Sequence, residues 1–330
     1  MRKLVPALTL VVLAACAGPA AETTVPEPTT TTSTSTTTST TTTTSSPTTT
    51  TSTTTTTTTI PTTTTTVAAP TTAPRETTTS RPAQPTVPAH CRPQMFTDEV
   101  VSQLLADYPG RQITAWVHDL RTSCDYSINP QNRQWTASVF KVMVMAGTLL
   151  EAQQEGRPVT DWEMSQLVPM ITRSTNDEVR ALWNHFGGSP WFKEQRDLFG
   201  LGQTTVRADD GSAWGRTTTS ARDQVNLIRQ VLVGQWGPLE SEYRAIALDL
   251  MTSVVSSQRW GVTAGVPGGW TVALKNGFAG EIINSVGWVD GPGADPGYVV
   301  AILTQGWPDH PSGIAAVERI SRIVAEAMTG

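Results

Sequence analysis

The sequence predicts an α+β fold in which an antiparallel sheet is flanked by helices and carries an inserted all-α subdomain. The first observation is the order of elements expected after residue 90: a helix, two strands, a block of helices, three strands and a final helix. Strands at the two ends of such an order meet in one sheet, because each must bury a face against the same helices. The second observation is length, since residues 91–330 suffice for one large core or two interlocked subdomains.

The chain begins with a segment typical of a secretory signal. Met1, Arg2 and Lys3 give a positive start, and the apolar run that follows is too short for a membrane span. We therefore interpret residues 1–15 as a signal peptide. The run ends in Leu-Ala-Ala directly before Cys16, which resembles the bacterial lipobox, whose cysteine is lipidated and becomes the mature N-terminus. The alternatives are an ordinary cleavage site and a plain anchor helix.

A long Thr-rich segment follows the signal. From Glu22 to Pro88 the sequence is nearly all Thr, with Ser, Pro and Ala. It has no apolar periodicity, so nothing offsets the conformational entropy that ordering it would cost. Tracts of this composition are typical of O-glycosylated stalks. We expect residues 16–90 to be a lipid-anchored, disordered stalk that spans on the order of 50 Å and holds an extracytoplasmic domain, residues 91–330, at the cell membrane.

The folded part opens with a helix and a hairpin. Thr97 or Asp98 can cap a helix that ends near Tyr108 and has apolar residues on one face. After a Pro-Gly pair comes a strand over 112–118, and a short turn leads to a second strand over 125–128. Together these two strands are predicted to form a β-hairpin.

The next element is a helix from Ser138 to about Gln154, whose apolar residues cover most of its circumference. A helix of this kind lies buried in the middle of a domain. The hydrophobic periodicity predicts the remaining helices over 162–171, 176–186, 190–198, 221–233, 241–255 and 314–328, and strands over 270–274, 285–289 and 298–304.

Composition and charge exclude several classes of function. The chain has 23 Lys and Arg against 28 Asp and Glu, with no basic block beyond its first residues, so we expect no nucleic-acid partner. Four histidines, His90, His118, His185 and His310, show no metal-ligand spacing, and neither a phosphate-binding glycine loop nor a nucleophile elbow occurs. We therefore expect no metal and no cofactor. Nothing in the sequence indicates an obligate oligomer, so a monomer is expected.

Two cysteines remain once Cys16 is assigned to a lipid. Cys91 and Cys124 would both lie on the oxidising side of the membrane, which favours a disulfide between them. The alternative is a pair of free thiols.

The residues that could carry chemistry begin with Ser138 and Lys141, which are three apart and so share one face of the predicted helix. A serine at a helix start lies near free N–H groups and the positive end of the dipole, which favour a developing alkoxide. A partly desolvated lysine beside it can lose its proton and act as a base. The pair alone is weak support, because an isolated match is more often a capping serine and a lysine with an exposed tip.

Two further groups follow in order along the chain. Ser174 and Asn176 stand just before a predicted helix, and Lys275, Asn276 and Gly277 follow a predicted strand. They supply a hydroxyl that can shuttle a proton, an amide that can orient the base, and a second lysine. The glycine would let a substrate backbone approach the strand edge.

This order resembles the β-lactamase and penicillin-binding-protein superfamily, whose signature is S-x-x-K, then S-D-N, then K-T-G. The resemblance is closest to class A β-lactamases and extends over residues 95–330. It implies that Ser138 is the acylated nucleophile, Lys141 the base, and Ser174 the hydroxyl that passes a proton to the leaving nitrogen. It also implies that Asn176 orients Lys141 and the substrate amide.

The same resemblance implies how a substrate is held. Lys275 would place positive charge near the shuttling hydroxyl and the substrate carboxylate. Asn276, Gly277 and Phe278, which follow it, would bind the substrate. The backbone N–H groups of Ser138 and Phe278 would form the oxyanion hole, where a missing donor typically costs about 3 kcal/mol of transition-state stabilisation. The implied partner is a small molecule, either a β-lactam or a cell-wall peptide.

The sequence departs from the class A pattern in ways that bear on the reaction. Class A β-lactamases carry a Glu that activates the water for hydrolysis of the acyl-enzyme, whereas the corresponding loop here has only Asp209 and Asp210 as carboxylates. Without such a base, acylation can proceed while deacylation is slow. Thr175 replaces the usual Asp, and Asn276 replaces a hydroxyl that holds the substrate carboxylate. Arg259 could compensate, or could equally be a plain surface residue.

The leading hypothesis is a class A β-lactamase-like acyl-serine enzyme that opens β-lactam amides through an acyl-enzyme at Ser138. The first alternative is a D,D-peptidase or penicillin-binding protein acting on cell-wall peptides. It uses the same chemistry, and the missing Glu favours it. The second alternative is a non-catalytic wall-binding lipoprotein that keeps the fold and the cleft.

Overall fold

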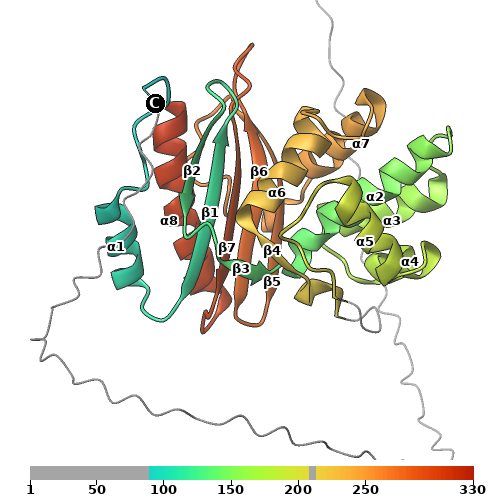
Figure 1. Ribbon diagram of the computed structural model, residues 1–330, viewed down its shortest axis with the longest axis horizontal. Coiled ribbons are helices and arrows are strands. Elements are labelled where there is room, and N and C mark those ends of the chain that lie inside the picture. The colour runs from blue at the N-terminus through green and yellow to red at the C-terminus, as the bar shows by residue number, and fades with distance from the viewer. Residues whose placement is uncertain (1–88, 208–212) are drawn as a thin grey trace, which may run out of the picture. The chain divides into compact units, whose positions relative to one another are not determined.

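The computed structural model describes residues 89–207 and 213–330 (Figure 1). The predicted signal peptide, the predicted lipidation site Cys16 and nearly all of the predicted stalk lie outside the described residues, as do Asp209 and Asp210. Among the helices within those two ranges, none has both the length and the hydropathy that crossing a membrane requires.

A five-stranded antiparallel sheet forms the centre of the folded part. Its strands are β1 (Gln112–Asp119), β2 (Cys124–Ile128), β5 (Thr271–Ala279), β6 (Ile282–Asp290) and β7 (Tyr298–Gln305). They lie in the order β2-β1-β7-β6-β5. The pairing of β1 with β7, in which Trp116 lies opposite Ala301, joins the N-terminal hairpin to the C-terminal strands. This pairing confirms the prediction that strands from the two ends of the folded part share one sheet.

Helices cover both faces of the sheet (Figure 1). The helices α1 (Asp98–Asp107) and α8 (His310–Thr329) lie on one face, and α6 (Ala221–Ile228) packs on the other. Side chains of β7 alternate between the two cores: Ala301 packs among the inserted helices, and its neighbour Ile302 packs in the core that contains α8. Because β7 is buried on both faces, nearly all of its residues are apolar.

The inserted helices form the predicted all-α subdomain beside the sheet (Figure 1). They are α2 (Phe140–Gln154), α3 (Asp161–Thr172), α4 (Asp177–His185), α5 (Ser189–Leu198) and α7 (Ser241–Thr252). As predicted, α2 is buried around most of its circumference. The helix predicted over 221–233 is α6 followed by a π-helical turn, Arg229–Val233, which Gly234 closes with a left-handed φ of 79°.

A short two-stranded sheet was not predicted. In it, β3 (Arg133–Trp135) pairs with β4 (Thr218–Ser220), and the N–H of Thr136 donates to the carbonyl of Thr217 at 2.9 Å. Strands this short show no alternation that sequence patterns could reveal. Their pairing matters because β3 leads directly into the turn that carries Ser138.

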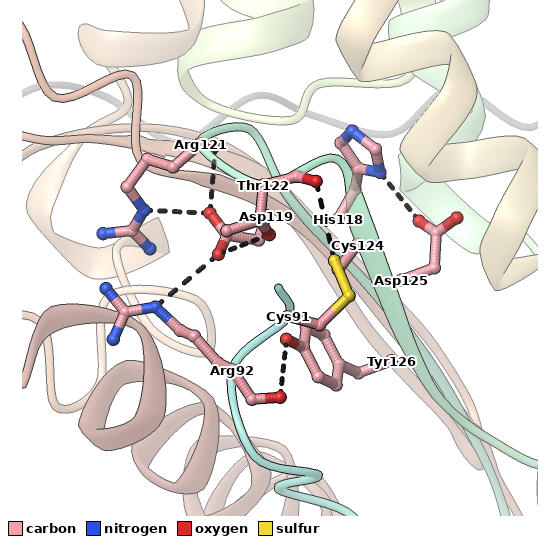
Figure 2. Close-up of a disulfide and its surroundings, with 9 residues drawn as sticks. All are labelled: Cys91, Arg92, His118, Asp119, Arg121, Thr122, Cys124, Asp125 and Tyr126. Atoms are coloured by element: carbon pink, nitrogen blue, oxygen red, sulfur yellow. Dashed lines mark hydrogen bonds and ion pairs between the residues drawn. A yellow bond between two sulfur atoms is a disulfide. The ribbon is translucent and has the colours of Figure 1, made fainter. Parts of the chain in front are cut away.

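The predicted disulfide joins Cys91 to Cys124, with the two Cα atoms 5.8 Å apart (Figure 2). Beside it the fully buried carboxylate of Asp119 forms ion pairs with Arg121 Nε at 2.9 Å and Arg92 Nε at 3.5 Å. Burial alone would raise the pKa of Asp119, but hydrogen bonds and charge from Arg121 outweigh it, and the pKa lies below its usual value. We call these five residues the disulfide corner.

Candidate active site

Ser138 lies beside β5 and β6 in a tight turn. It is the middle residue of a single 3-10 turn, η1 (Ala137–Val139), so the α-helix begins two residues later than predicted. The preceding Ala137 has a φ of +44°, a left-handed conformation that is costly for a residue with a Cβ. Asn284 on β6 fixes the turn by donating to the carbonyl of Thr136 at 3.0 Å. The hydroxyl is thereby held at the edge of a cleft.

The amine of Lys141 contacts four oxygen atoms. Its Nζ lies 3.0 Å from Ser138 Oγ, 2.8 Å from Asn176 Oδ1, and 2.6 Å and 3.3 Å from the carbonyl oxygen and Oγ of Ser174. The carbonyl oxygens of Ser174 and Asn176 can only accept, so each takes one proton of the amine. When the amine is neutral, its lone pair is therefore left for the two hydroxyls, of which Ser138 Oγ is the nearer. Removal of a proton from Ser138 requires this arrangement.

Because Lys141 is buried, the neutral form of its amine is populated near neutral pH. The side chain of Lys141 is fully buried, which lowers its pKa to about 7, while the negative charge of Glu178 opposes this shift. Glu178 lies in the first turn of α4, two residues after Asn176, and its Oε2 is buried without a hydrogen-bond partner among the described residues. Glu178 was not among the predicted site residues. Its position two residues after Asn176, at the start of a helix, was the sequence feature that could have indicated it.

Ser174 Oγ lies between two lysines. Lys275 Nζ donates to it at 2.8 Å, and Lys141 Nζ lies 3.3 Å away. A left-handed φ of 63° at Ser174 turns both its carbonyl and its hydroxyl toward the lysines. Lys275 is also fully buried, and burial together with the charge of Lys141 holds its pKa well below the usual value. The structure thus brings together all the predicted catalytic side chains: Ser138, Lys141, Ser174, Asn176 and Lys275.

The strand β5 passes next to the nucleophile at Gly277. A Cβ at this position would lie 2.9 Å from the backbone nitrogen of Ser138 and 2.9 Å from the carbonyl oxygen of Thr136. Glycine is therefore needed here so that the strand can pass this close to the turn that carries Ser138. Lys275 lies inside β5 and not after a strand as predicted. Phe278, the next residue after Gly277, lines the same cleft as Ser138, as a shared oxyanion hole would require.

Asn276 does not reach the cleft with its side chain. Strand alternation turns it away from the face that carries Lys275. Its amide donates to the carbonyls of Gln258 at 2.7 Å and Trp260 at 3.0 Å, and accepts from Ser285 Oγ at 2.6 Å. Both amide protons and the carbonyl oxygen are thereby engaged in holding a loop. The predicted contact between this side chain and a substrate is corrected to a structural role.

Arg259 is also placed away from the cleft. Its guanidinium donates to the carbonyls of Thr252 at 3.1 Å and Val272 at 3.4 Å. These contacts tie the end of α7 to the start of β5. Arg259 therefore does not compensate for the hydroxyl that Asn276 replaces.

A cleft with a volume of about 600 Å³ opens beside Ser138. This volume lies within the range of about 300–1,000 Å³ that is typical of small-molecule sites. Asn176 lines it, and aromatic side chains form much of the wall. The aromatic and charged residues of the lining are Trp135, Trp214, Arg216, Phe278 and Glu281.

Trp214 covers the buried amine of Lys141. The residue begins the 3-10 turn η2 (Trp214–Arg216), and its ring centroid lies 5.2 Å from Lys141 Nζ. The same ring stacks on Phe140 with centroids 5.9 Å apart and planes inclined by 22°. In the part of the chain that the structure describes, no carboxylate forms an ion pair with Lys141 or Lys275. No sequence signal pointed to Trp214.

One group of potential metal ligands occurs among the described residues. It comprises His90, Cys91 and Cys124, whose donor atoms lie within 4.8 Å of one another. Because the two cysteines share a disulfide, they offer no thiolate, and one imidazole does not make a site. His118 instead pairs through Nδ1 with Asp125 Oδ1 at 2.8 Å (Figure 2).

Comparison with solved structures yields close matches in fold. A structure of PBP-A superposes with a TM-score of 0.62 at 22% sequence identity, covering 69% of this chain and 94% of that chain. An ancestral class A β-lactamase gives a TM-score of 0.62 at 20% identity, over 71% of this chain and 100% of that chain. A β-lactamase from Burkholderia phymatum gives 0.61 at 20% identity, over 69% and 96% of the two chains. At these identities the likeness shows a shared fold.

Comparison of sequences identifies the family. No curated protein matches this chain. A model of the beta-lactamase enzyme family, however, matches residues 97–164 and 165–328, which is well over half of the sequence. The match spans the elements that carry the lysine network and the cleft. This chain therefore belongs to the beta-lactamase enzyme family.

Proposed function

We propose that this protein is an acyl-serine enzyme that opens β-lactam amides through an ester at Ser138. The observation that carries the proposal is the contact set of Lys141. Two carbonyl oxygens, of Ser174 and Asn176, hold its protons and leave its lone pair for the hydroxyls, of which Ser138 Oγ at 3.0 Å is nearer than Ser174 Oγ at 3.3 Å. Because burial lowers the pKa of Lys141 to about 7, a large share of the amine is neutral at physiological pH.

In the acylation step, Ser138 Oγ would attack the lactam carbonyl while its proton passes to Lys141 Nζ. The ring C–N bond then breaks, and the nitrogen takes a proton from Ser174 Oγ, which Lys141 can resupply across 3.3 Å. Lys275, 2.8 Å from the same hydroxyl, would stabilise the transient negative charge on it. The backbone N–H groups of Ser138 and Phe278 would stabilise the oxyanion.

One side of the cleft offers a cation to an anionic group on a small amide. Arg216 lies there with its guanidinium carbon 5.7 Å from the ring centroid of Trp135, and Glu281 is the carboxylate of the lining. Arg216, and not Arg259, is therefore the arginine placed to meet a substrate carboxylate. A PBP-A mutant with the same fold, at 23% identity, has been described as an acyl-enzyme complex with penicillin G. That complex supports penicillin as the first substrate to test.

A D,D-peptidase or penicillin-binding protein acting on cell-wall peptides is the second candidate. All four oxygen contacts of the Lys141 amine are uncharged groups, and the ring of Trp214 covers it. Within residues 89–207 and 213–330, no carboxylate is paired with Lys141 where it could activate a hydrolytic water. An acyl-enzyme that hydrolyses slowly fits a peptide-processing enzyme that β-lactams inhibit.

We also propose an extracytoplasmic location, with the domain anchored to the cell membrane through a lipid on Cys16. The disulfide between Cys91 and Cys124 supports this location, because disulfides persist in oxidising compartments. The test is metabolic labelling with a clickable fatty acid. The wild type should incorporate the label and Cys16→Ala should not, whereas equal labelling would contradict the anchor.

To test the enzyme activity, the purified full-length protein is incubated with benzylpenicillin. Peptides are analysed by mass spectrometry over time, and an adduct is expected on the peptide that contains Ser138 and on none in Ser138→Ala. A persistent adduct supports the peptidase candidate, and an adduct that disappears with release of penicilloic acid supports the β-lactamase candidate. A wild type that forms no adduct and releases no more penicilloic acid than Ser138→Ala contradicts both and favours the non-catalytic wall-binding alternative.

A further inference from the structure

We infer that Trp214 governs the lifetime of the acyl-enzyme by filling the space beside Lys141 in which a hydrolytic water would have to be activated. This inference rests on the proposed function, because it requires an ester at Ser138. It concerns a positioning residue, since Trp214 would act through the water and through Lys141 rather than on the reacting bond.

Hydrolysis of the ester needs a water beside a proton acceptor. The water oxygen bonds to the ester carbon, one water proton passes to Lys141 Nζ, and that proton moves on to Ser138 Oγ as the C–Oγ bond breaks. The products are a carboxylic acid and the free serine. For this route, the lone pair of Nζ must face the water. Four oxygen atoms, one of Ser138, two of Ser174 and one of Asn176, already lie between 2.6 and 3.3 Å from Nζ.

The indole of Trp214 lies over the same amine. Its centroid is 5.2 Å from Nζ, and the residue lines the cleft together with Ser138. A buried water needs two to four polar partners, and a ring face supplies no strong donor or acceptor. A water that entered between the ring and Lys141 would therefore lack partners on one side. Among the residues that the structure describes, the network and the ring together leave no favourable place for it.

The ring is fixed to the turn that carries the nucleophile. It stacks on Phe140, the residue before Lys141. Its own turn is held by the N–H of Thr217, which donates to the carbonyl of Trp214 at 3.0 Å, and by Thr136 Oγ1, which donates to the carbonyl of Gly215 at 3.3 Å. These contacts hold Trp214 against the segment that carries Ser138 and Lys141.

The position of Trp214 gives it opposite effects on the two half-reactions. By excluding water from Lys141 it keeps the amine desolvated, which favours the neutral base and speeds acylation. By excluding water from the ester it slows deacylation. A change that only damaged the fold would slow both steps, so the two signs distinguish this role from a structural one. Within the described ranges, the groups whose charge acts on Lys141 are Lys275 and Glu178, and neither changes when Trp214 is replaced.

The test compares full-length wild type with Trp214→Ala and Trp214→Phe, using a fluorescent penicillin. Acylation is the rate of labelling, and deacylation is the loss of label after an excess of unlabelled penicillin. In Trp214→Ala, deacylation should be about ten-fold faster or more, which corresponds to about 1.4 kcal/mol. Acylation should be slower near neutral pH. In a plot of acylation rate against pH, the rising limb should move to higher pH. Trp214→Phe keeps a smaller ring, and its acylation and deacylation rates should lie between those of the wild type and Trp214→Ala.

The matched control is Trp162→Ala, which removes an exposed indole from α3 and should leave both rates unchanged. A folded Trp214→Ala that loses its label at the wild-type rate or slower overturns the inference. Where Trp214→Ala fails to fold, Trp214→Phe decides, and its deacylation must exceed that of the wild type. A wild type that takes no label contradicts the proposed function itself, whereas a labelled wild type with unchanged variant lifetimes contradicts this inference alone.

Discussion

The disulfide corner and the candidate active site treat buried charge in opposite ways. In the disulfide corner, the buried carboxylate of Asp119 has Arg121 and Arg92 as ion-pair partners (Figure 2). In the candidate active site, Lys141 and Lys275 are buried as completely, yet the oxygen atoms that they contact belong to uncharged groups. The two lysines share one serine hydroxyl, so their charges also disfavour each other.

The difference separates stability from reactivity. A buried charge with opposite partners keeps its charge, and accordingly the pKa of Asp119 lies below its usual value once Arg121 outweighs burial. A buried charge without opposite partners is costly, and the group responds by giving up its proton more easily. For Lys141 that response creates a base near neutral pH. The corner holds the fold together, and the site gives up stability to obtain a reactive amine.

The largest expected effect comes from a permanent charge in the site. Lys141→Arg keeps a cation, but a guanidinium does not lose its proton in proteins. Labelling of Ser138 by a fluorescent penicillin should therefore slow about 10²–10⁴-fold, the contribution typical of a general base. Lys193→Arg, at an exposed position on α5, is the matched control and should label at the wild-type rate. Wild-type labelling of a folded Lys141→Arg would place the base elsewhere.

The second prediction is that the disulfide corner affects the stability of the fold and not the reaction at Ser138. Replacing Cys91 and Cys124 with Ala removes a bridge between residues 33 apart in sequence, and should lower the free energy of unfolding by about 3–4 kcal/mol. Urea unfolding measures the loss, and wild type with a reductant should match the variant. The pH dependence of penicillin labelling should stay as it is. A shifted pH profile would show that the disulfide corner also affects the candidate active site, and would contradict the distinction between the two regions.

Spacing alone pairs only Ser138 with Lys141, and the grouping of these two with Ser174, Asn176 and Lys275 could be foreseen because the motifs occur in the order of the family signature that they resemble. The sheet could be foreseen because apolar periodicity marks each strand and the element order leaves one way to pair the ends. Trp214 could not, because its role depends on a loop that folds back onto Phe140 from far along the chain. Asn276 shows a related limit, since only the placed loop with Gln258 decides which partners its side chain finds.

A third prediction concerns Asn276, which the sequence assigned to the substrate and the structure assigns to the scaffold. Asn276→Ala leaves two half-buried backbone carbonyls and the buried Ser285 hydroxyl without this partner. The free energy of unfolding should fall by about 1–3 kcal/mol. The concentration of penicillin that gives half-maximal labelling rate should not change. Weaker penicillin binding with unchanged stability would instead restore the substrate-binding role.

The smallest expected effect tests Glu178, a carboxylate whose charge acts on Lys141. Because the neutral amine is the base, labelling should rise with pH through about 7 and level off above it. The negative charge of Glu178 raises the pKa of Lys141, so Glu178→Gln should lower that pKa and move the rising limb to lower pH. Labelling at pH 6 should then increase, on the order of two- to five-fold, and labelling on the plateau should not change.

Two variants control this last measurement. Glu178→Asp keeps the charge and should keep the limb near its wild-type position, and Glu194→Gln removes an exposed carboxylate from α5 without effect. A limb that stays in place or moves to higher pH in Glu178→Gln would contradict the electrostatic role. The substitution is a clean one, because the buried Oε2 of Glu178 has no hydrogen-bond partner among the described residues. Replacing the carboxylate with an amide removes its charge and breaks no contact there, so a shift of the limb reports the charge alone.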